Sequence, residues 1–289
     1  MAVTTHTLET DGAEIAYDVH GPLPTADGRP PLLMIGQPMD AGGFTTLASY
    51  FHDRTVVTYD PRGLARSRRR DGAVEHVPAV QAEDLHALIG ALGAGPVEMF
   101  ASSGGAVTAL ALVAAHPGDV TTLVAHEPPL IPVVPDAGAA RRARAAVRDV
   151  YEAGGANAGM AAFIAMTSWR GEFTEDYFAQ PAPDPAMFGM PGDDDGTRDS
   201  ALLSDRSWPV SGYDPDVDRL AAAKTRIVIA VGEESRDTLT WRASVGIAER
   251  LGQQATVFPS HHGGFVSHEH GQPEAFARKL REVLDVDRQ

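Results

Sequence analysis

The feature that most constrains the fold of this chain is a series of short apolar runs that alternate with helical patterns. Each run is bounded by turn residues, as is typical of buried parallel strands. The runs lie at residues 32–35, 55–59, 97–100, 121–125 and 226–231, with a weaker copy at 255–258. Two further short strands, at residues 5–8 and 14–19, are expected on either side of the Asp11-Gly12 turn.

Helical periodicity fills the intervals between these runs. Residues 80–92 carry Leu85, Leu88, Ile89 and Leu92 on one face, and residues 106–115 are apolar all round, as in a buried helix. Residues 241–251 and 274–284 are amphipathic. The alternation predicts an α/β fold, in which helices cover both faces of a mostly parallel, eight-stranded sheet.

The alternation stops between residues 128 and 223, where no convincing buried strand is found. This stretch has helical patterns at 139–151 and 158–169 and a segment rich in Pro, Asp and Gly at 180–199. We interpret 128–223 as a mostly helical cap, inserted into a core domain of residues 1–127 and 224–289. A disordered linker is the alternative, and the apolar residues of the stretch disfavour it. They are Phe163, Met166, Trp169, Phe173, Tyr177, Phe178, Met187, Phe188 and Trp208.

Composition limits the classes of function. The 289 residues include 24 Lys and Arg against 39 Asp and Glu, a net charge of −15. This balance disfavours binding to nucleic acids and to anionic membranes. The absence of cysteine excludes disulfides, thiolate nucleophiles and thiolate metal sites. No signal peptide is visible, and the apolar stretch 106–115 is shorter than the roughly 20 residues of a membrane span. We therefore expect a soluble, cytoplasmic protein, and homo-oligomerisation stays open.

A candidate nucleophile lies where an expected strand runs into an expected helix. The sequence there is Ala101-Ser102-Ser103-Gly104-Gly105. It resembles the G-x-S-x-G nucleophile elbow of the α/β-hydrolases, with Ala101 replacing the first glycine. When Gly105 is aligned with the last glycine, Ser103 is the nucleophile and Ser102 the variable residue. The alternative is a Ser-Gly-Gly helix start without chemistry.

Two further segments resemble the same superfamily, so that the resemblance covers nearly all of the chain outside the expected cap. Residues 33–44 are similar to its H-G-x-P loop, with Ile35 in place of the usual histidine. Residues 59–67 are similar to its D-x-R-G-x-G-x-S segment, with Ala65 in place of a glycine. The resemblance implies an oxyanion hole formed by the backbone N–H groups of Gln37 and Gly104. Pro38 has no N–H and is excluded.

The base that a serine nucleophile needs is expected on the loop before the last helix. The superfamily places its catalytic histidine there, and the pattern P-x-x-H-x-G-F selects His262 over His261. His261, His262, His268 and His270 also have a spacing that binds metal ions adventitiously. With no carboxylate partner identifiable in the sequence, we expect neither a physiological metal nor a cofactor.

A serine–histidine pair also needs an acid that orients the histidine, and two places in the sequence can supply it. Its usual place in the superfamily, after the strand that follows the cap, is occupied by Ser235. The nearby carboxylates Glu233, Glu234 and Asp237 are out of register. A second location is the end of the strand before the cap, where this chain has Glu127 followed by two prolines. Haloalkane dehalogenases and the fungal zearalenone lactonase carry a glutamate at this place. We therefore favour Glu127, and a structural buried carboxylate is the alternative.

Together these residues predict a serine hydrolase that acts on carboxylic esters or lactones through an acyl-enzyme. Dehalogenase and epoxide hydrolase chemistry is excluded, because those enzymes need an aspartate where Ser103 stands. The cap is expected to line the pocket with Met166, Trp169, Phe188 and Trp208. The favoured substrate is a bulky hydrophobic lactone, with a zearalenone-like resorcylic macrolactone as the most specific hypothesis. The alternatives are an esterase of small esters, a perhydrolase, and a non-catalytic homologue that binds a hydrophobic ligand.

Overall fold

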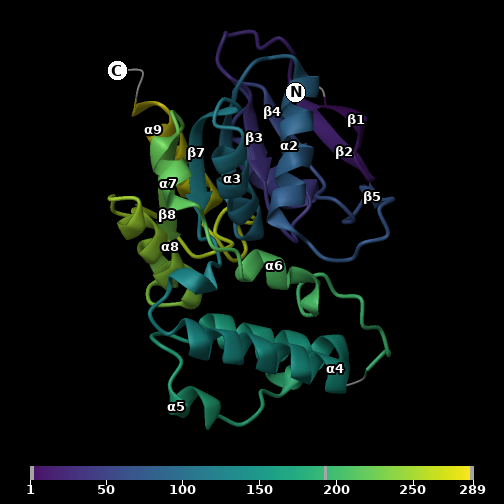
Figure 1. Ribbon diagram of the computed structural model, residues 1–289, viewed down its shortest axis with the longest axis vertical. Helices are drawn as coiled ribbons and strands as arrows, with labels where there is room; N and C mark the ends of the chain where they lie inside the picture. The colour runs from purple at the N-terminus through teal and green to yellow at the C-terminus, as the bar shows by residue number, and fades with distance from the viewer. Residues whose placement is uncertain (1–2, 192–193, 287–289) are drawn as a thin grey trace.

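A single sheet forms the centre of the computed structural model, which describes residues 3–191 and 194–286. Within these residues nine strands pair in the order β1-β2-β4-β3-β6-β7-β8-β9, and β5 pairs with β2 (Figure 1). The strands are β1 (Val3–Thr10), β2 (Ala13–His20), β3 (Leu32–Ile35), β4 (Val56–Tyr59), β5 (Arg68–Arg69), β6 (Val97–Ser102), β7 (Val120–His126), β8 (Arg226–Gly232) and β9 (Thr256–Phe258).

The sheet is parallel from β4 to β9, and β2 runs antiparallel to β1, β4 and β5. The prediction of a mostly parallel α/β sheet is therefore confirmed. The structure contains the eight predicted strands and one additional strand, β5, which is two residues long. Its arginines have no apolar pattern, so the strand was not predictable from hydrophobicity.

Helices cover both faces of the sheet (Figure 1). On one face α2 (Pro78–Leu92), α3 (Gly104–Ala115) and α8 (Leu239–Arg250) share an apolar core with residues such as Leu33 and Met99. On the other face α1 (Thr45–Ser49) and α9 (Pro273–Leu284) pack on residues such as Met34 and Phe100. Alternating strand residues thus supply two separate cores. No helix within the described residues is both long enough and apolar enough to span a membrane.

The segment between β7 and β8 is mostly helical where it is described, and we call residues 128–223 the insertion. Its helices are α4 (Ala137–Ser168), α5 (Glu175–Phe178), α6 (Trp208–Ser211) and α7 (Val217–Ala222). The two predicted helical patterns form the two halves of α4, which is kinked at Gly155, where φ is 81°. Figure 1 shows α4 and α5 at the end of the molecule farthest from the N-terminus. That the insertion is a separate cap domain stays a prediction.

Short 3-10 helices complete the connections. They lie at Ala41–Phe44, Ile131–Val133, Pro185–Phe188, Asp205–Ser207 and Glu233–Ser235.

Candidate active site

Ser103 lies on a sharp turn between β6 and α3. Its φ of 57° and ψ of −128° are unusual for a residue with a side chain, and a conformation of this kind costs about 1–3 kcal/mol. The backbone N–H of Ser103 donates to the carbonyl of His126 over 2.9 Å, which holds the turn against β7. The half-buried side chain faces a cavity beside the N-terminus of α3, where helical N–H groups favour negative charge.

The turn depends on small residues next to the serine. A Cβ atom added at Gly105 would lie 2.7 Å from the Cα atom of Gly36, and one at Gly104 would lie 2.8 Å from the carbonyl oxygen of Gln37. Both contacts are with backbone, which has little room to move. The Gly-Gly pair therefore allows α3 to start directly against the loop after β3.

Glu127 is the carboxylate beside His262. It follows β7 with a φ of 48°, and its side chain has no exposed surface. One oxygen, Oε1, accepts a hydrogen bond from the N–H of Gly232 over 2.8 Å. The other, Oε2, lies 2.6 Å from Nδ1 of His262 and accepts from Oγ1 of Thr240 over 3.0 Å. Three segments distant in sequence thus meet at this carboxylate.

These contacts keep Glu127 ionised. Burial alone would raise its pKa, but the hydrogen bond and charge of His262, the nearby His126 and the Gly232 N–H outweigh burial and lower the pKa to about 2. An ionised carboxylate can only accept hydrogen bonds, so His262 carries its proton on Nδ1. The other ring nitrogen, Nε2, is then the one that can exchange a proton with a nucleophile.

The other histidine of the loop is held differently. Nδ1 of His261 accepts from the N–H of Gly263 over 3.1 Å, and its Nε2 bonds to the carbonyl of His270. The side chain of His262 is 41% exposed, and it lines the cavity. Of the two histidines, His262 is therefore the one paired with a buried carboxylate.

The carboxylates on the loop after β8 do not occupy the place beside His262. Glu234 lines the cavity, and its Oε1 accepts from the side-chain amide of Gln272 over 3.2 Å. Glu233 and Asp237 are absent from the described residues that line the cavity. Ser235, at the usual acid position, is buried and lines the cavity.

The cavity has a volume of about 770 Å³ and lies between the core and the insertion. Its lining includes Ser103, Gly104, Gln37 and His262, so the sequence-predicted groups meet in one space. Apolar side chains contribute much of the remaining wall. They are Met39, Pro129, Ile131, Phe163, Met166, Leu202, Val210 and Leu239.

Of the four cap residues expected in the pocket, the structure places Met166 in the cavity wall. Trp169, Phe188 and Trp208 are not among the described lining residues. Trp169 packs edge-on against Tyr177 and donates to the carbonyl of Glu172, and Phe188 is 39% exposed. Aromatic composition indicated a cap with apolar surfaces, but it could not show which side chains turn toward the cavity.

Two arginines of the cavity wall were not predicted. Arg144, on α4, is buried and donates to the carbonyls of Leu202 and Ser204, so it ties α4 to the segment before α6. Arg170 donates to the carbonyl of Glu234 over 2.9 Å. Neither residue stands in a sequence pattern that could have revealed these contacts.

A second serine and histidine lie behind the site. Oγ of Ser102 is 3.3 Å from Nδ1 of His126, and the ring of His126 is stacked 6.0 Å from that of His262. His126 is completely buried among the rings of Phe100, Phe258 and neighbouring phenylalanines, and burial lowers its pKa to about 4. This histidine is therefore neutral at pH 7.

The buried His126 should make the fold sensitive to mild acid. Its folded pKa of about 4 lies below the unfolded value near 6.5. The unfolded state therefore binds more protons between these values. The free energy of unfolding should therefore be highest above pH 6.5 and should decrease, by roughly 3 kcal/mol, as the pH falls toward 4. Urea unfolding at pH 7.0 and at pH 4.5 measures the difference.

His126→Gln should flatten this pH dependence, even though it lowers stability at pH 7. His52→Gln is the matched control, because His52 is exposed, and it should leave the slope unchanged. Equal slopes for the parent and His126→Gln would show that other groups cause the acid sensitivity.

Comparison with known proteins agrees with this architecture. Residues 32–172 match the family model described as alpha/beta hydrolase fold. The chain has this fold, with a mostly parallel central sheet and helices around it.

The individual relatives are distant, but each covers at least 96% of the chain. An uncharacterised hydrolase, YraK of Bacillus subtilis (strain 168), is 25% identical over 100% of this chain and 98% of its own length. A thermophilic esterase from Thermogutta terrifontis superposes with a TM-score of 0.62 at 21% identity, covering 98% of each chain. Est816, described as an N-acyl homoserine lactone degrading enzyme, gives a TM-score of 0.64 at 20% identity, covering 96% of this chain and 99% of its own.

Proposed function

We propose that the protein is a serine hydrolase of carboxylic esters and lactones, in which Ser103, His262 and Glu127 form the catalytic triad. The observation that carries the proposal is the 2.6 Å hydrogen bond between the buried Glu127 carboxylate and Nδ1 of His262. It lies at the wall of a cavity that Ser103 also lines. A buried, ionised carboxylate that orients an accessible imidazole is the arrangement that activates a serine.

The reaction follows from these roles. Nε2 of His262 takes the hydroxyl proton while Oγ of Ser103 attacks the carbonyl carbon, and a tetrahedral oxyanion forms. His262 then returns the proton to the leaving alkoxide as the ester bond breaks, which leaves an acyl group on Ser103. A water molecule, deprotonated by His262, attacks this acyl group, and His262 returns the proton to Oγ of Ser103 as the bond to the acyl group breaks and the acid is released. Glu127 stabilises the imidazolium formed in both halves.

The proposed oxyanion hole consists of the N–H groups of Gln37 and Gly104. The Gly104 N–H donates to the carbonyl of Gln37 over 3.3 Å, which is long for such a bond. A developing oxyanion is a stronger acceptor than this carbonyl, because hydrogen bonds to charged acceptors are about twice as strong. We infer that the Gly104 N–H turns from Gln37 to the oxyanion during the reaction.

The size and apolar wall of the cavity support a bulky, hydrophobic substrate. A volume of about 770 Å³ is within the range of sites for drug-sized ligands. Similarity to a lactone-degrading enzyme supports a lactone as the electrophile. Within this class we retain a resorcylic macrolactone of the zearalenone type as the most specific proposal, and small esters and perhydrolysis as the alternatives.

The substrate proposal is tested by incubating a panel of esters and lactones, zearalenone included, with the parent protein and Ser103→Ala. Mass spectrometry should show the gain of one water on a macrolactone with the parent alone. Cleavage restricted to small aryl esters would refute the macrolactone and leave an esterase. Peroxide-dependent oxidation in the presence of acetate would indicate a perhydrolase. Turnover of none of the panel would favour a non-catalytic ligand-binding protein.

A further inference from the structure

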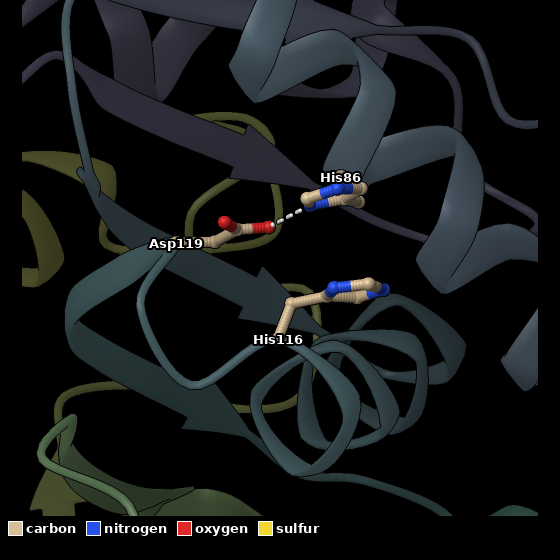
Figure 2. A group of neighbouring side chains, drawn as sticks. All are labelled: His86, His116 and Asp119. Atoms are coloured by element: carbon tan, nitrogen blue, oxygen red, sulfur yellow. Dashed lines mark hydrogen bonds and ion pairs between the residues drawn. The ribbon is translucent and has the colours of Figure 1, made fainter.

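A second group of reactive side chains lies far from the triad, at the opposite end of α3 from Ser103. It consists of His86 on α2, His116 directly after α3, and Asp119 directly before β7 (Figure 2). One potential ligand atom from each of the three residues lies within 4.8 Å of the others. None of these residues lines the cavity, so the triad does not explain their arrangement.

The two imidazole rings are held parallel beside the carboxylate. Their centroids are 3.8 Å apart and their planes differ by 8°. Nδ1 of His86 lies 2.7 Å from Oδ2 of Asp119, as Figure 2 shows. Nε2 of His116 lies 2.9 Å from Oε1 of Glu83, one turn before His86 on α2. Each ring therefore has one nitrogen directed by a carboxylate.

We propose that His86, His116 and Asp119 bind a divalent transition-metal ion of the zinc class. Two imidazole nitrogens and one carboxylate oxygen suit Zn²⁺, Ni²⁺, Co²⁺ or Cu²⁺, whereas Mg²⁺ and Ca²⁺ prefer oxygen ligands. Because Nε2 of His116 is hydrogen-bonded to Glu83, Nδ1 of His116 is the nitrogen that would face the ion. Glu83 then orients this ligand from behind, as carboxylates commonly do for metal-bound histidines.

The backbone presents two of these ligands on one rigid turn. The N–H of His116 donates to the carbonyl of Leu112 over 2.7 Å, and the N–H of Asp119 donates to the carbonyl of His116 over 3.1 Å. The carbonyl of Asp119 also accepts from the N–H of Val97 over 2.9 Å, which ties the turn to β6. Only the third ligand comes from another helix, so binding orders few additional groups.

The side chains are accessible to an ion from solvent. The side chain of His86 is 47% exposed, that of His116 25% and that of Asp119 18%. Binding would require the two stacked rings to rotate so that their nitrogens converge on one centre, with water completing the coordination. A bound ion would link α2 to the turn between α3 and β7 and would stabilise the folded state, because the unfolded chain has no preformed site.

The test is titration of the full chain, freed of metal by a chelator, with Zn²⁺ at pH 7.5 in a calorimeter. We expect one equivalent to bind with micromolar affinity, and Mg²⁺ to give no signal. His86→Ala and His116→Ala should each weaken binding by about tenfold or more. The matched control is His270→Ala, which removes an exposed histidine of the loop that carries His262 and should leave this binding intact. Zn²⁺ should raise the Tm of the parent and not that of His86→Ala.

Co²⁺ provides an independent readout, because its visible absorption reports directly on nitrogen and oxygen ligands. A spectrum that disappears in His86→Ala and His116→Ala supports the site. Binding that survives both substitutions but is lost in His270→Ala would place the ion on the loop that carries His262 and would overturn the proposal. The absence of binding at submillimolar Zn²⁺ would overturn it as well. Hydrolytic activity is not used in either readout.

Discussion

Ser103→Ala should lower kcat for ester hydrolysis by about 10⁴-fold or more, with little change in the affinity for substrate. In the proposed mechanism the substitution removes the atom that forms the acyl-enzyme, while the cavity wall and the proposed oxyanion donors remain. Loss of the nucleophile in other serine hydrolases leaves only the small residual rate due to binding and oxyanion stabilisation. Steady-state kinetics with a chromogenic ester measures the effect.

The matched control for this substitution is Ser102→Ala. Ser102 is the neighbouring hydroxyl, and it is bonded to the buried His126 rather than to His262. Its replacement should lower kcat far less than Ser103→Ala. The account would be contradicted if Ser102→Ala abolished turnover while Ser103→Ala retained it.

Glu127→Gln should lower kcat by about 10⁴-fold, the effect of the corresponding change in other triads. The amide is nearly the same shape and can still accept the Gly232 N–H. Its NH₂ group, however, donates toward Nδ1 of His262 and stabilises the tautomer with the proton on Nε2. That tautomer cannot accept the proton of Ser103, and the imidazolium also loses its counter-charge. The kinetics should be compared at equal folded fraction, as judged by circular dichroism.

Thr240→Val is the control for Glu127→Gln. It removes one neutral donor to the same carboxylate oxygen but leaves the charge in place. A loss of about one hydrogen bond, roughly 1 kcal/mol, corresponds to about a fivefold decrease in kcat. Near-normal turnover by Glu127→Gln would transfer the acid role to another carboxylate, of which Glu234 is the one that lines the cavity.

The sequence was informative where one local pattern determines a structure. The tight turn at Ser103 could be predicted because a strand, a serine between small residues and a buried helix are contiguous in the sequence. The strands of the parallel sheet were predictable for the same reason, since each is a short apolar run between turn residues. Resemblance to known hydrolases was needed to select Glu127 as the candidate acid, because nothing in the local sequence distinguishes it from a structural carboxylate.

Features built from distant segments were not predictable in this way. The Gly232 N–H and Thr240 hydroxyl that hold Glu127 come from β8 and α8, more than a hundred residues along the chain. Similarly, Trp208 and Met166 are both apolar residues of the insertion, yet only Met166 is among the described residues of the cavity wall. Met166 lies on α4 and Trp208 on α6, and the direction of each side chain depends on how its helix packs, which periodicity does not reveal.

The most direct test of the central proposal is to locate the acyl group on the enzyme. The parent protein is mixed with a slowly hydrolysed ester, quenched in acid during the first turnover, digested and mapped by mass spectrometry. We predict a mass increase equal to the acyl group on the peptide that contains Ser103, localised to that residue by fragmentation and absent from Ser103→Ala. An acyl group on a different residue, or turnover by Ser103→Ala at the parental rate, would contradict the proposed mechanism.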